Sequence, residues 1–353
     1  MTTVRVNLGK RSYDIIIKKG LFKHLGRELR ARSKATKIIV VTDQNVERLY
    51  GKQLKTLLVA AGFTPLVVAI EPGETSKNLA VLGNLYEKMA AFGLTRSDLL
   101  VTFGGGVVGD LGGFAAATFL RGIQLVQVPT SLLAQIDSSV GGKVAVDLTS
   151  GKNLVGSFYQ PQAVLIDPEL LKTLPVRFLH DGLAEAIKYG CIADESLFAM
   201  LEDTPNDAVL VANSDALIAS CCKIKARIVE RDEFDTGERM LLNFGHTIGH
   251  AIEKCTGYES YTHGEAVAIG MVRLTARTEA LGLTAAGTTA RLQALLLKFD
   301  LPLQAETPNE QLLAAMLLDK KKNGDELTLV ILEKIGASFL QKVPFAALTE
   351  YMG

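Results

Sequence analysis

Short apolar runs alternate with helical patterns through the first 130 residues, and this alternation constrains the fold more than any other feature of the chain. Each run is long enough for one buried strand and is followed by apolar residues at helical spacing. Such an order predicts a parallel, doubly wound α/β sheet with helices on both faces. The expected strands are 37–43, 64–70, 98–103 and 123–129, the expected helices 46–61, 77–92 and 108–119, and a strand pair is expected within 4–17.

The pattern changes after the apolar segment AVLIDPELL at 163–171. Beyond it, strand patterns nearly vanish and long helical patterns run to the end of the chain. We therefore expect two domains with a border at Pro175, which suits a length of 353 residues. Residues 1–175 would form the Rossmann-like α/β domain, and residues 176–353 would form a mainly α-helical domain.

Open parallel sheets bind their ligands at the carboxyl ends of the strands. Polar and glycine residues follow several of the expected strands, so this edge is the candidate ligand site of the first domain. The residues expected there are Asp43, Asn45, Glu74, Lys77, the loop Gly104 to Asp110, which includes Gly105 and Gly106, and the pair Thr130 and Ser131.

The loop GGGVVGD at 104–110 contains a GxGxxG pattern between a strand and a helix. Amides at a helix N-terminus bind phosphate, which favours a dinucleotide, but close packing of helix on strand explains the glycines equally well. An ordinary dinucleotide site places an acid at the end of the next strand, about 20 residues on. That strand ends in Pro129-Thr130 instead, and the acid that ends a strand is Asp43, far upstream. A dinucleotide would therefore bind with its adenosine side near Asp43 and Glu74.

Three of the five histidines lie within one glycine-studded segment, at His246, His250 and His263. A helix from Asn243 to Lys254 would place the first two rings on one face, one turn apart. Histidines gathered in this way indicate a divalent metal site that lacks its last protein ligand. The alternative is that they make core contacts and that His263 lies in a solvated loop. The pattern is not HExxH, because Thr247 follows the first histidine, so a zincin protease is excluded.

Glu185 and Lys188 are three residues apart in a helical segment whose other residues are apolar or small. An exposed ion pair is one interpretation. The apolar neighbours favour a buried pair or one that faces a cleft, and Glu185 is then the candidate for the missing metal ligand. Lys143 and Lys152 are expected in glycine-flanked turns, whereas Lys225 and the run 320–322 have the pattern of solvated basic residues.

Composition excludes several classes of function. Lysine and arginine together equal aspartate and glutamate, at 38 each, so no global charge favours nucleic acid or a membrane surface. The N-terminal residues lack the apolar core of a signal peptide, and no apolar run approaches the ~20 residues that span a bilayer. The four cysteines show no CxxC spacing, which favours reduced thiols and a cytoplasmic protein.

A set of long motifs resembles the 3-dehydroquinate synthase family over nearly the whole chain, in order. The motifs are GGGVVGDLGGFAAATFLRG, VPTSLLAQIDSSVGGKVAVDL, GKNLVGSFYQP, LAEAIKYG, LLNFGHTIGHAIE and HGEAVAIGM. The resemblance implies an NAD-binding α/β domain, a helical metal-binding domain and a homodimer. It also implies a lyase of the shikimate pathway that converts 3-deoxy-D-arabino-heptulosonate 7-phosphate to 3-dehydroquinate and phosphate. The cofactor NAD would be reduced and reoxidised within each turnover.

The same resemblance implies a role for individual residues. Glu185, His246 and His263 resemble the ligands of Zn²⁺ or Co²⁺, and Asp137 and His250 are candidates for proton handling. Residues that resemble the pocket for the substrate's phosphate and carboxylate are Lys143, Lys188, Lys225, Arg239, Asn243, His250 and one lysine of 320–322, for which we favour Lys321. Residues that resemble cofactor contacts are Lys152 and Asn153, with Asp43, Asn45, Glu74, Lys77, Gly105, Gly106, Asp110, Thr130, Ser131 and Lys143.

Three other functions remain open from the residues alone. Another sugar-phosphate cyclase would have no need for Arg239 or for one of the lysines, since its substrate has no carboxylate. A metal-dependent polyol dehydrogenase would share the domain order but would leave Glu185, Lys188 and the other lysines poorly explained. An NAD-responsive binding protein would require no metal ion and would release no phosphate.

Overall fold

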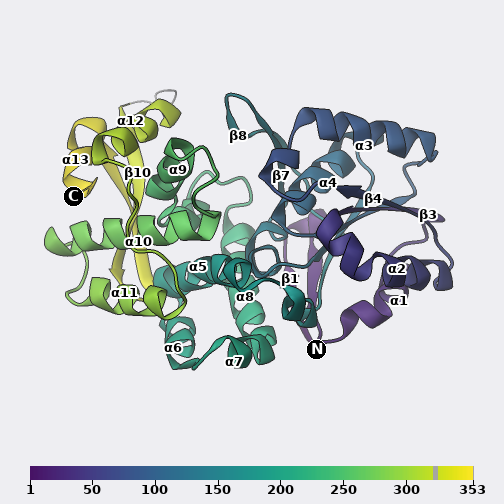
Figure 1. Cartoon of the computed structure of the whole chain (residues 1–353), viewed down its shortest axis with the longest axis horizontal. Helices are drawn as coiled ribbons and strands as arrows, with labels where there is room; N and C mark the ends of the chain where they lie inside the picture. The colour runs from purple at the N-terminus through teal and green to yellow at the C-terminus, as the bar shows by residue number, and fades with distance from the viewer. Residues whose placement is uncertain (321–324, 353) are drawn as a thin grey trace. The chain divides into compact units, whose positions relative to one another are not determined.

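The computed structural model describes residues 1–320 and 325–352, which divide into two compact units (Figure 1). The first unit comprises Met1–Leu174 and Val211–Glu233, and the second comprises Pro175–Leu210 and the chain from Phe234 onward. The chain leaves the first unit at Leu174, next to the expected border at Pro175. It then returns to that unit for helix α8 (Ser214–Arg231), which the sequence pattern had placed in the second domain.

The first unit contains a seven-stranded sheet in which six neighbouring strands run parallel, so the expected Rossmann-like architecture is confirmed. Only the edge strand β1 pairs antiparallel, with β2. Across the sheet the strands are β1 (Thr2–Val6), β2 (Tyr13–Ile17), β9 (Ala163–Ile166), β6 (Gln124–Pro129), β5 (Leu99–Gly104), β3 (Lys37–Asp43) and β4 (Thr64–Ile70).

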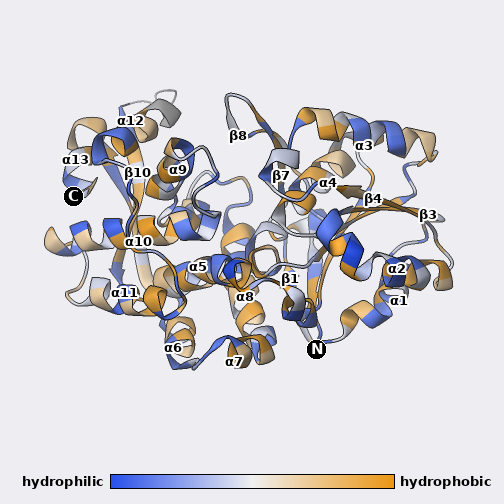
Figure 2. Cartoon of the chain, in the orientation of Figure 1, coloured by the Kyte–Doolittle hydropathy of each residue, from blue (hydrophilic) through white to orange (hydrophobic). Residues whose placement is uncertain are grey.

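Helices cover both faces of this sheet, because its central strands are apolar on both sides. Ile38 and Val40 of β3 pack with α1 (Leu25–Arg30) and α2 (Gln44–Ala60). Ile39 and Val41, which point the other way, pack with α3 (Leu79–Ala91) and α4 (Gly106–Thr118). In Figure 1, α3 and α2 lie on opposite sides of the strands, and Figure 2 shows apolar strands between helices with polar outer surfaces.

Helix α4 packs unusually close to the sheet. A Cβ atom on Gly112 would lie 2.6 Å from Cγ2 of Thr102, and one on Gly113 would lie 2.4 Å from Cγ1 of Val144. No side chain fits at either position, so these glycines allow the helix to approach the strands. This close contact fixes the start of α4 at the carboxyl ends of β5 and β6.

Lys143 and Lys152 lie in strands, so the expected glycine-flanked turns are wrong. Lys143 begins β7 (Lys143–Leu148), and Lys152 is the second residue of β8 (Gly151–Phe158), which pairs antiparallel with β7. The strand conformation is favoured over a turn because Val144 and Val146 alternate along β7 and are both buried in the core beside α4.

The second unit is mainly helical, as expected, but it also contains a hairpin. Strands β10 (Glu326–Lys334) and β11 (Ala337–Pro344) pair antiparallel. A short apolar run such as that of β10 cannot be told from a buried helix by periodicity alone. The helices are α5 (Val176–Ala193), α6 (Glu195–Asp203), α9 (His246–Cys255), α10 (His263–Ala280), α11 (Thr288–Lys298), α12 (Asn309–Lys320) and α13 (Leu348–Met352), and α7 (Asp207–Ala212) spans the change of unit. Within residues 1–320 and 325–352, none of the helices has the length and apolarity needed to cross a bilayer.

Two glycines test the close packing of α4. Gly112→Ala should lower the free energy of unfolding by about 1–3 kcal/mol, because its methyl group overpacks the contact with Thr102. Gly83→Ala in α3 is the matched control, since a Cβ there would meet nothing within 4 Å. It should stabilise the protein by about 1 kcal/mol through helix propensity. Urea denaturation measures the free energy of unfolding of both variants, provided that the m-value stays constant. Equal stabilities of Gly112→Ala and Gly83→Ala would contradict the packing argument.

Candidate active site

Helix α5 buries a charged pair. Glu185 is completely buried and Lys188 is 1% exposed, so the predicted burial of this pair is confirmed. The ammonium of Lys188 forms an ion pair with Oε2 of Glu185, one turn back along the same helix. A buried carboxylate and a buried ammonium are costly to desolvate, which makes the pair a candidate for function rather than for stability alone.

The first two histidines of the cluster lie on α9, which starts later than expected. The predicted start at Asn243 is wrong, because Gly245 has a left-handed backbone (φ 77°) and separates a short 3-10 helix, Glu238–Asn243, from α9. A Cβ on Gly245 would lie 2.7 Å from the carbonyl oxygen of Val267, so the start of α9 packs directly on α10. His246 and His250 project one turn apart, with ring centroids separated by 5.4 Å.

The third histidine, His263, is the first residue of α10. Thr262 caps this helix: its hydroxyl accepts from the amide of Glu265, whose carboxylate accepts from the amide of Thr262 at 2.9 Å. This capping box fixes the direction of the first turn. The His263 ring centre consequently lies 5.1 Å from that of His246.

Glu185 lies between two of the three imidazoles. Its Oε1 is 3.4 Å from Nε2 of His246 and 3.5 Å from Nε2 of His263. Neither carboxylate oxygen accepts a hydrogen bond of good geometry, although both are buried and Lys188 lies beside one of them. One carboxylate and two imidazoles form a donor set typical of zinc and leave positions open for a ligand. Glu185, His246 and His263 therefore fit a divalent cation.

The electrostatics of the two imidazoles differ. Burial lowers the pKa of His246 well below its usual value, and the ammonium of Lys188 lowers it further. Its ring is thus neutral, the form that binds a metal ion. Burial also lowers the pKa of His263, but the carboxylates of Glu185 and Glu253 outweigh it and raise this pKa to about 10. The cluster thus holds a proton where a metal ion would compete with it.

Two acidic residues of this cluster were missed by the sequence analysis. Glu253 is buried, and its Oε2 lies 3.6 Å from Nδ1 of His263, the ring nitrogen that faces away from Glu185. A carboxylate at that nitrogen orients a metal-binding ring. Its spacing of three residues from His250 on the same helix was the available signal. The second missed residue, Asp181, accepts the amide of Gly264 at 2.6 Å.

The other predicted site residues of the second unit differ in how far they are exposed to solvent. Arg239, in the 3-10 helix before α9, is 2% exposed, whereas Asn243 and His250 are exposed. Lys321 lies outside the described residues.

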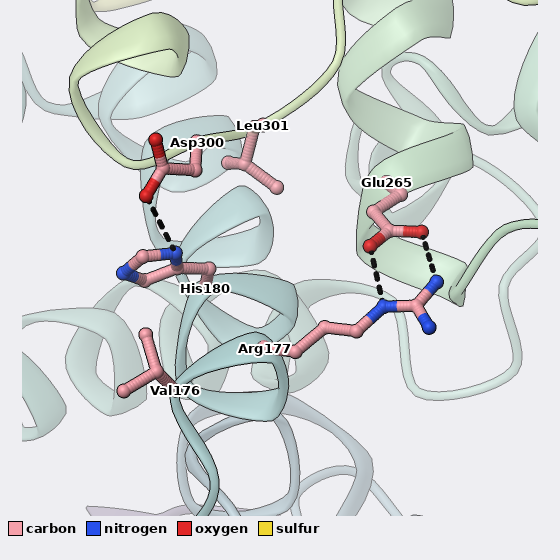
Figure 3. Close-up of a pocket in the computed structure, with 6 residues that line it drawn as sticks. All are labelled: Val176, Arg177, His180, Glu265, Asp300 and Leu301. Atoms are coloured by element: carbon pink, nitrogen blue, oxygen red, sulfur yellow. Dashed lines mark hydrogen bonds and ion pairs between the residues drawn. The ribbon is translucent and has the colours of Figure 1, made fainter.

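A separate cavity of about 220 Å³ opens beside the start of α5 (Figure 3). Arg177 binds both carboxylate oxygens of Glu265 at 2.8 Å, and Nδ1 of His180 lies 4.0 Å from Asp300. The lining residues are Val176, Arg177, His180, Glu265, Asp300 and Leu301. None of them is a predicted site residue.

In the first unit, Lys77 is the centre of a polar network. Its ammonium is 2.6 Å from Asp110 on α4 and 2.5 Å from the amide oxygen of Asn153 on β8. Glu74 lies 3.7 Å away and also approaches Lys152 at 3.6 Å. Burial alone would lower the pKa of Lys77, but Asp110 and Glu74 raise it above its usual value. Five of the predicted cofactor contacts therefore lie together.

Except for Lys143, which begins β7, the remaining predicted cofactor contacts lie at the carboxyl ends of the parallel strands. Asp43 ends β3 and caps α2 by accepting from the amides of Asn45 and Val46. Gly105 caps α4, and Gly106 is its first residue. The amide of Thr130 donates to Gly104, and Ser131 accepts from the amide of Ala134. The expected edge of the sheet thus carries all of these residues.

Lys225 is not a solvated lysine. It is 6% exposed on α8 and donates to the carbonyl oxygen of Asp137 at 2.7 Å and to the carboxylate of the same residue. Asp137 lies in a π-helical turn, Ala134–Ser138, a local geometry that is frequent at functional sites. Lys143 is exposed at the start of β7.

Comparison with known proteins identifies the family. Family models described as the N-terminal and C-terminal parts of 3-dehydroquinate synthase match residues 67–181 and 182–322. The chain is 50% identical over 353 residues to a 3-dehydroquinate synthase of Clostridium acetobutylicum, covering 100% of this chain and 99% of the relative. The chain belongs to the 3-dehydroquinate synthase family.

Two solved structures resemble this member of the 3-dehydroquinate synthase family along its length. One is a 2-deoxy-scyllo-inosose synthase complexed with carbaglucose-6-phosphate, NAD⁺ and Co²⁺, with a TM-score of 0.88 and 27% identity over 100% of both chains. The other is a 2-epi-5-epi-valiolone synthase from Streptomyces hygroscopicus with NAD⁺ and Zn²⁺ bound, with a TM-score of 0.86 and 26% identity over 96% of both chains. The expected fold of the family is thus present throughout.

The network around Lys77 makes a prediction about stability. Lys77→Met removes the cation beside Asp110, whose pKa is raised by burial and lowered by Lys77. This change should cost about 1–3 kcal/mol at pH 7, because a largely buried carboxylate is left without its partner. A carboxylate whose folded-state pKa is raised takes up its proton more readily in the folded state. The deficit should therefore shrink as the pH falls from 7 to 5.

The control for this prediction is the double variant Lys77→Met with Asp110→Asn, followed by denaturation at both pH values. It should regain most of the lost stability and show no such pH dependence. A double variant as unstable as the single one would mean that the loss is not electrostatic.

Proposed function

We propose that Glu185, His246 and His263 hold a divalent ion, Zn²⁺ or Co²⁺, and that the network around Lys77 binds NAD. Membership of the family makes the chain a 3-dehydroquinate synthase, a carbon–oxygen lyase that converts 3-deoxy-D-arabino-heptulosonate 7-phosphate to 3-dehydroquinate and phosphate. The observation that carries the metal proposal is the buried carboxylate of Glu185, whose Oε1 faces the Nε2 atoms of two imidazoles.

The two proposed groups would supply the unusual chemistry. NAD⁺ held by the network around Lys77 would accept a hydride from the substrate's C5 alcohol and return it later, and a metal ion held by Glu185, His246 and His263 would lower the pKa of that alcohol. Oxidation at C5 makes the neighbouring C–H acidic, so phosphate can leave, and reduction, ring opening and an intramolecular aldol closure follow. The metal and NAD named in the two similar cyclase structures support both assignments.

Charged residues of the second unit are proposed to bind the anionic ends of the substrate. Lys188 is held by its ion pair next to the proposed metal ligand, and Arg239 is buried before α9. A fixed cation in a poorly solvated place binds phosphate or carboxylate far more strongly than one in water. Asn243 and His250 supply further polar contacts, and His250 is also proposed to move a proton.

Residues of the first unit are proposed to complete this chemistry. Asp137 holds the ammonium of Lys225 through both its carbonyl and its carboxylate, which fixes a donor for the substrate. Asp137 is also proposed to exchange a proton during the reaction. Lys143 is exposed at the start of β7 and is proposed to contact an anion. Asp43, Asn45, Gly105, Gly106, Thr130 and Ser131 supply polar and backbone contacts for NAD. Lys321, a homodimer and a cytoplasmic location stay predictions.

The substrate separates this function from another cyclase. Phosphate should be released from the heptulosonate phosphate with catalytic NAD, whereas glucose 6-phosphate, which has no carboxylate, should give none. A chelator should abolish release, and added Zn²⁺ or Co²⁺ should restore it. The reduced nicotinamide absorbance should stay flat, because each hydride is returned.

A stoichiometric rise in that absorbance would instead select a dehydrogenase. Full activity of a rigorously metal-free sample would exclude the proposed role of Glu185, His246 and His263. Turnover of glucose 6-phosphate would select the cyclase alternative.

The proposed anion contacts predict that their loss weakens binding of the substrate but not of NAD. Lys188→Ala and Arg239→Ala should each raise the KM for the heptulosonate phosphate about 10- to 100-fold, because one charge-assisted contact is lost. The Kd for NAD, measured by titration at saturating metal, should not change. Lys254→Ala is the control, since Lys254 is an exposed lysine on α9. An equal loss of substrate and NAD binding would show that Lys188 and Arg239 are structural.

A further inference from the structure

Three residues spaced one turn apart on α5 contact three consecutive residues of the first turn of α10. Glu185 meets His263, Asp181 meets Gly264, and Arg177 meets Glu265. The first contact belongs to the proposed metal site, and the other two do not. The row of contacts between α5 and α10 thus includes two proposed metal ligands together with residues that have no role in the mechanism.

The contact of Asp181 is the closest of the three. Its Oδ1 accepts the amide of Gly264 at 2.6 Å, and Asp181 is 7% exposed. A carboxylate at a helix N-terminus satisfies a free amide and interacts favourably with the helix dipole. A Cβ on Gly264 would lie 2.0 Å from the carbonyl oxygen of Asp181, so the two backbones touch.

We propose that Asp181 is a positioning residue that sets the affinity of the metal site by fixing the first turn of α10 against α5. The inference rests on the proposed function of Glu185, His246 and His263 as metal ligands. Glu185 belongs to α5 and His263 to α10, so the separation of these two ligands depends on how the helices dock. Productive ligand geometry must hold to within about 0.5 Å, and a single buried carboxylate in the adjoining turn supplies that constraint.

Arg177 and Glu265 make the third contact, and its position predicts a smaller effect. The Arg177 side chain is 58% exposed and that of Glu265 is 16% exposed, so water screens the pair (Figure 3). Losing Arg177 should therefore change the docking of α10 much less than losing Asp181. The difference between the two variants separates a buried contact from a surface one.

The experiment is a Co²⁺ titration of the metal-stripped full chain, followed by the visible absorbance of the bound ion. Asp181→Ala should weaken binding about 10-fold or more and alter the spectrum, as expected when a supporting contact of a ligand is lost. Asp181→Asn keeps an oxygen that can accept from Gly264 and should bind Co²⁺ more tightly than Asp181→Ala. Arg177→Ala should weaken binding less than about 3-fold.

Asp194→Ala is the matched control, because Asp194 caps α6 by accepting from the amides of Ser196 and Leu197 at 3.0 and 3.2 Å. Helix α6 carries none of the proposed ligands. This variant should lose thermal stability and keep the Co²⁺ affinity and spectrum of the unchanged protein. Equal weakening of Co²⁺ binding by Asp194→Ala would overturn the proposal, because general destabilisation would then explain both variants.

Two other outcomes are distinguishable. Unchanged Co²⁺ affinity and spectrum in Asp181→Ala would refute the positioning role while leaving the metal site intact. Failure of the unchanged protein to bind Co²⁺, or binding that His246→Ala does not weaken, would refute the metal site itself and the inference with it.

Discussion

The buried carboxylate of Glu185 is the constraint on which the second unit depends. A carboxylate without water is destabilising unless positive charge or hydrogen-bond donors surround it. Here one ammonium comes from the same helix, and two imidazoles come from α9 and α10. Three helices must therefore converge on one residue. Gly245, at the start of α9, makes a close contact with α10 beside this convergence.

The polar network of the first unit has the opposite arrangement of charge. There a single buried ammonium, that of Lys77, is surrounded by Asp110, Glu74 and the amide oxygen of Asn153. The ammonium of Lys77 contacts oxygen acceptors from three residues, whereas Oε1 of Glu185 faces two imidazole nitrogens. The network around Lys77 is therefore suited to ordering polar contacts, whereas the cluster around Glu185 is suited to taking up an additional cation.

Periodicity predicted the parts of this chain in which one physical signal dominates. The parallel strands were recognisable because apolar residues fill both faces, as in Ile38 and Ile39 of β3. Glu185 was a candidate because a charge in so apolar a helix has to be compensated. Glu253 and Asp181 were missed because their importance depends on what another helix places beside them. The late start of α9 depends on Gly245, whose left-handed backbone the sequence pattern did not reveal.

The return of the chain to the first unit affects how this unit can be assembled during synthesis. Helix α8 packs on β1, on β2 and on the π-helical turn that carries Asp137, yet it follows all of them by many residues. Domains tend to fold as units while the chain emerges from the ribosome. A nascent chain that has reached only Leu174 lacks α8 and therefore leaves the surfaces of β1 and β2 uncovered. The N-terminal unit becomes complete only after Glu233 has been translated, when part of the other unit has already been made.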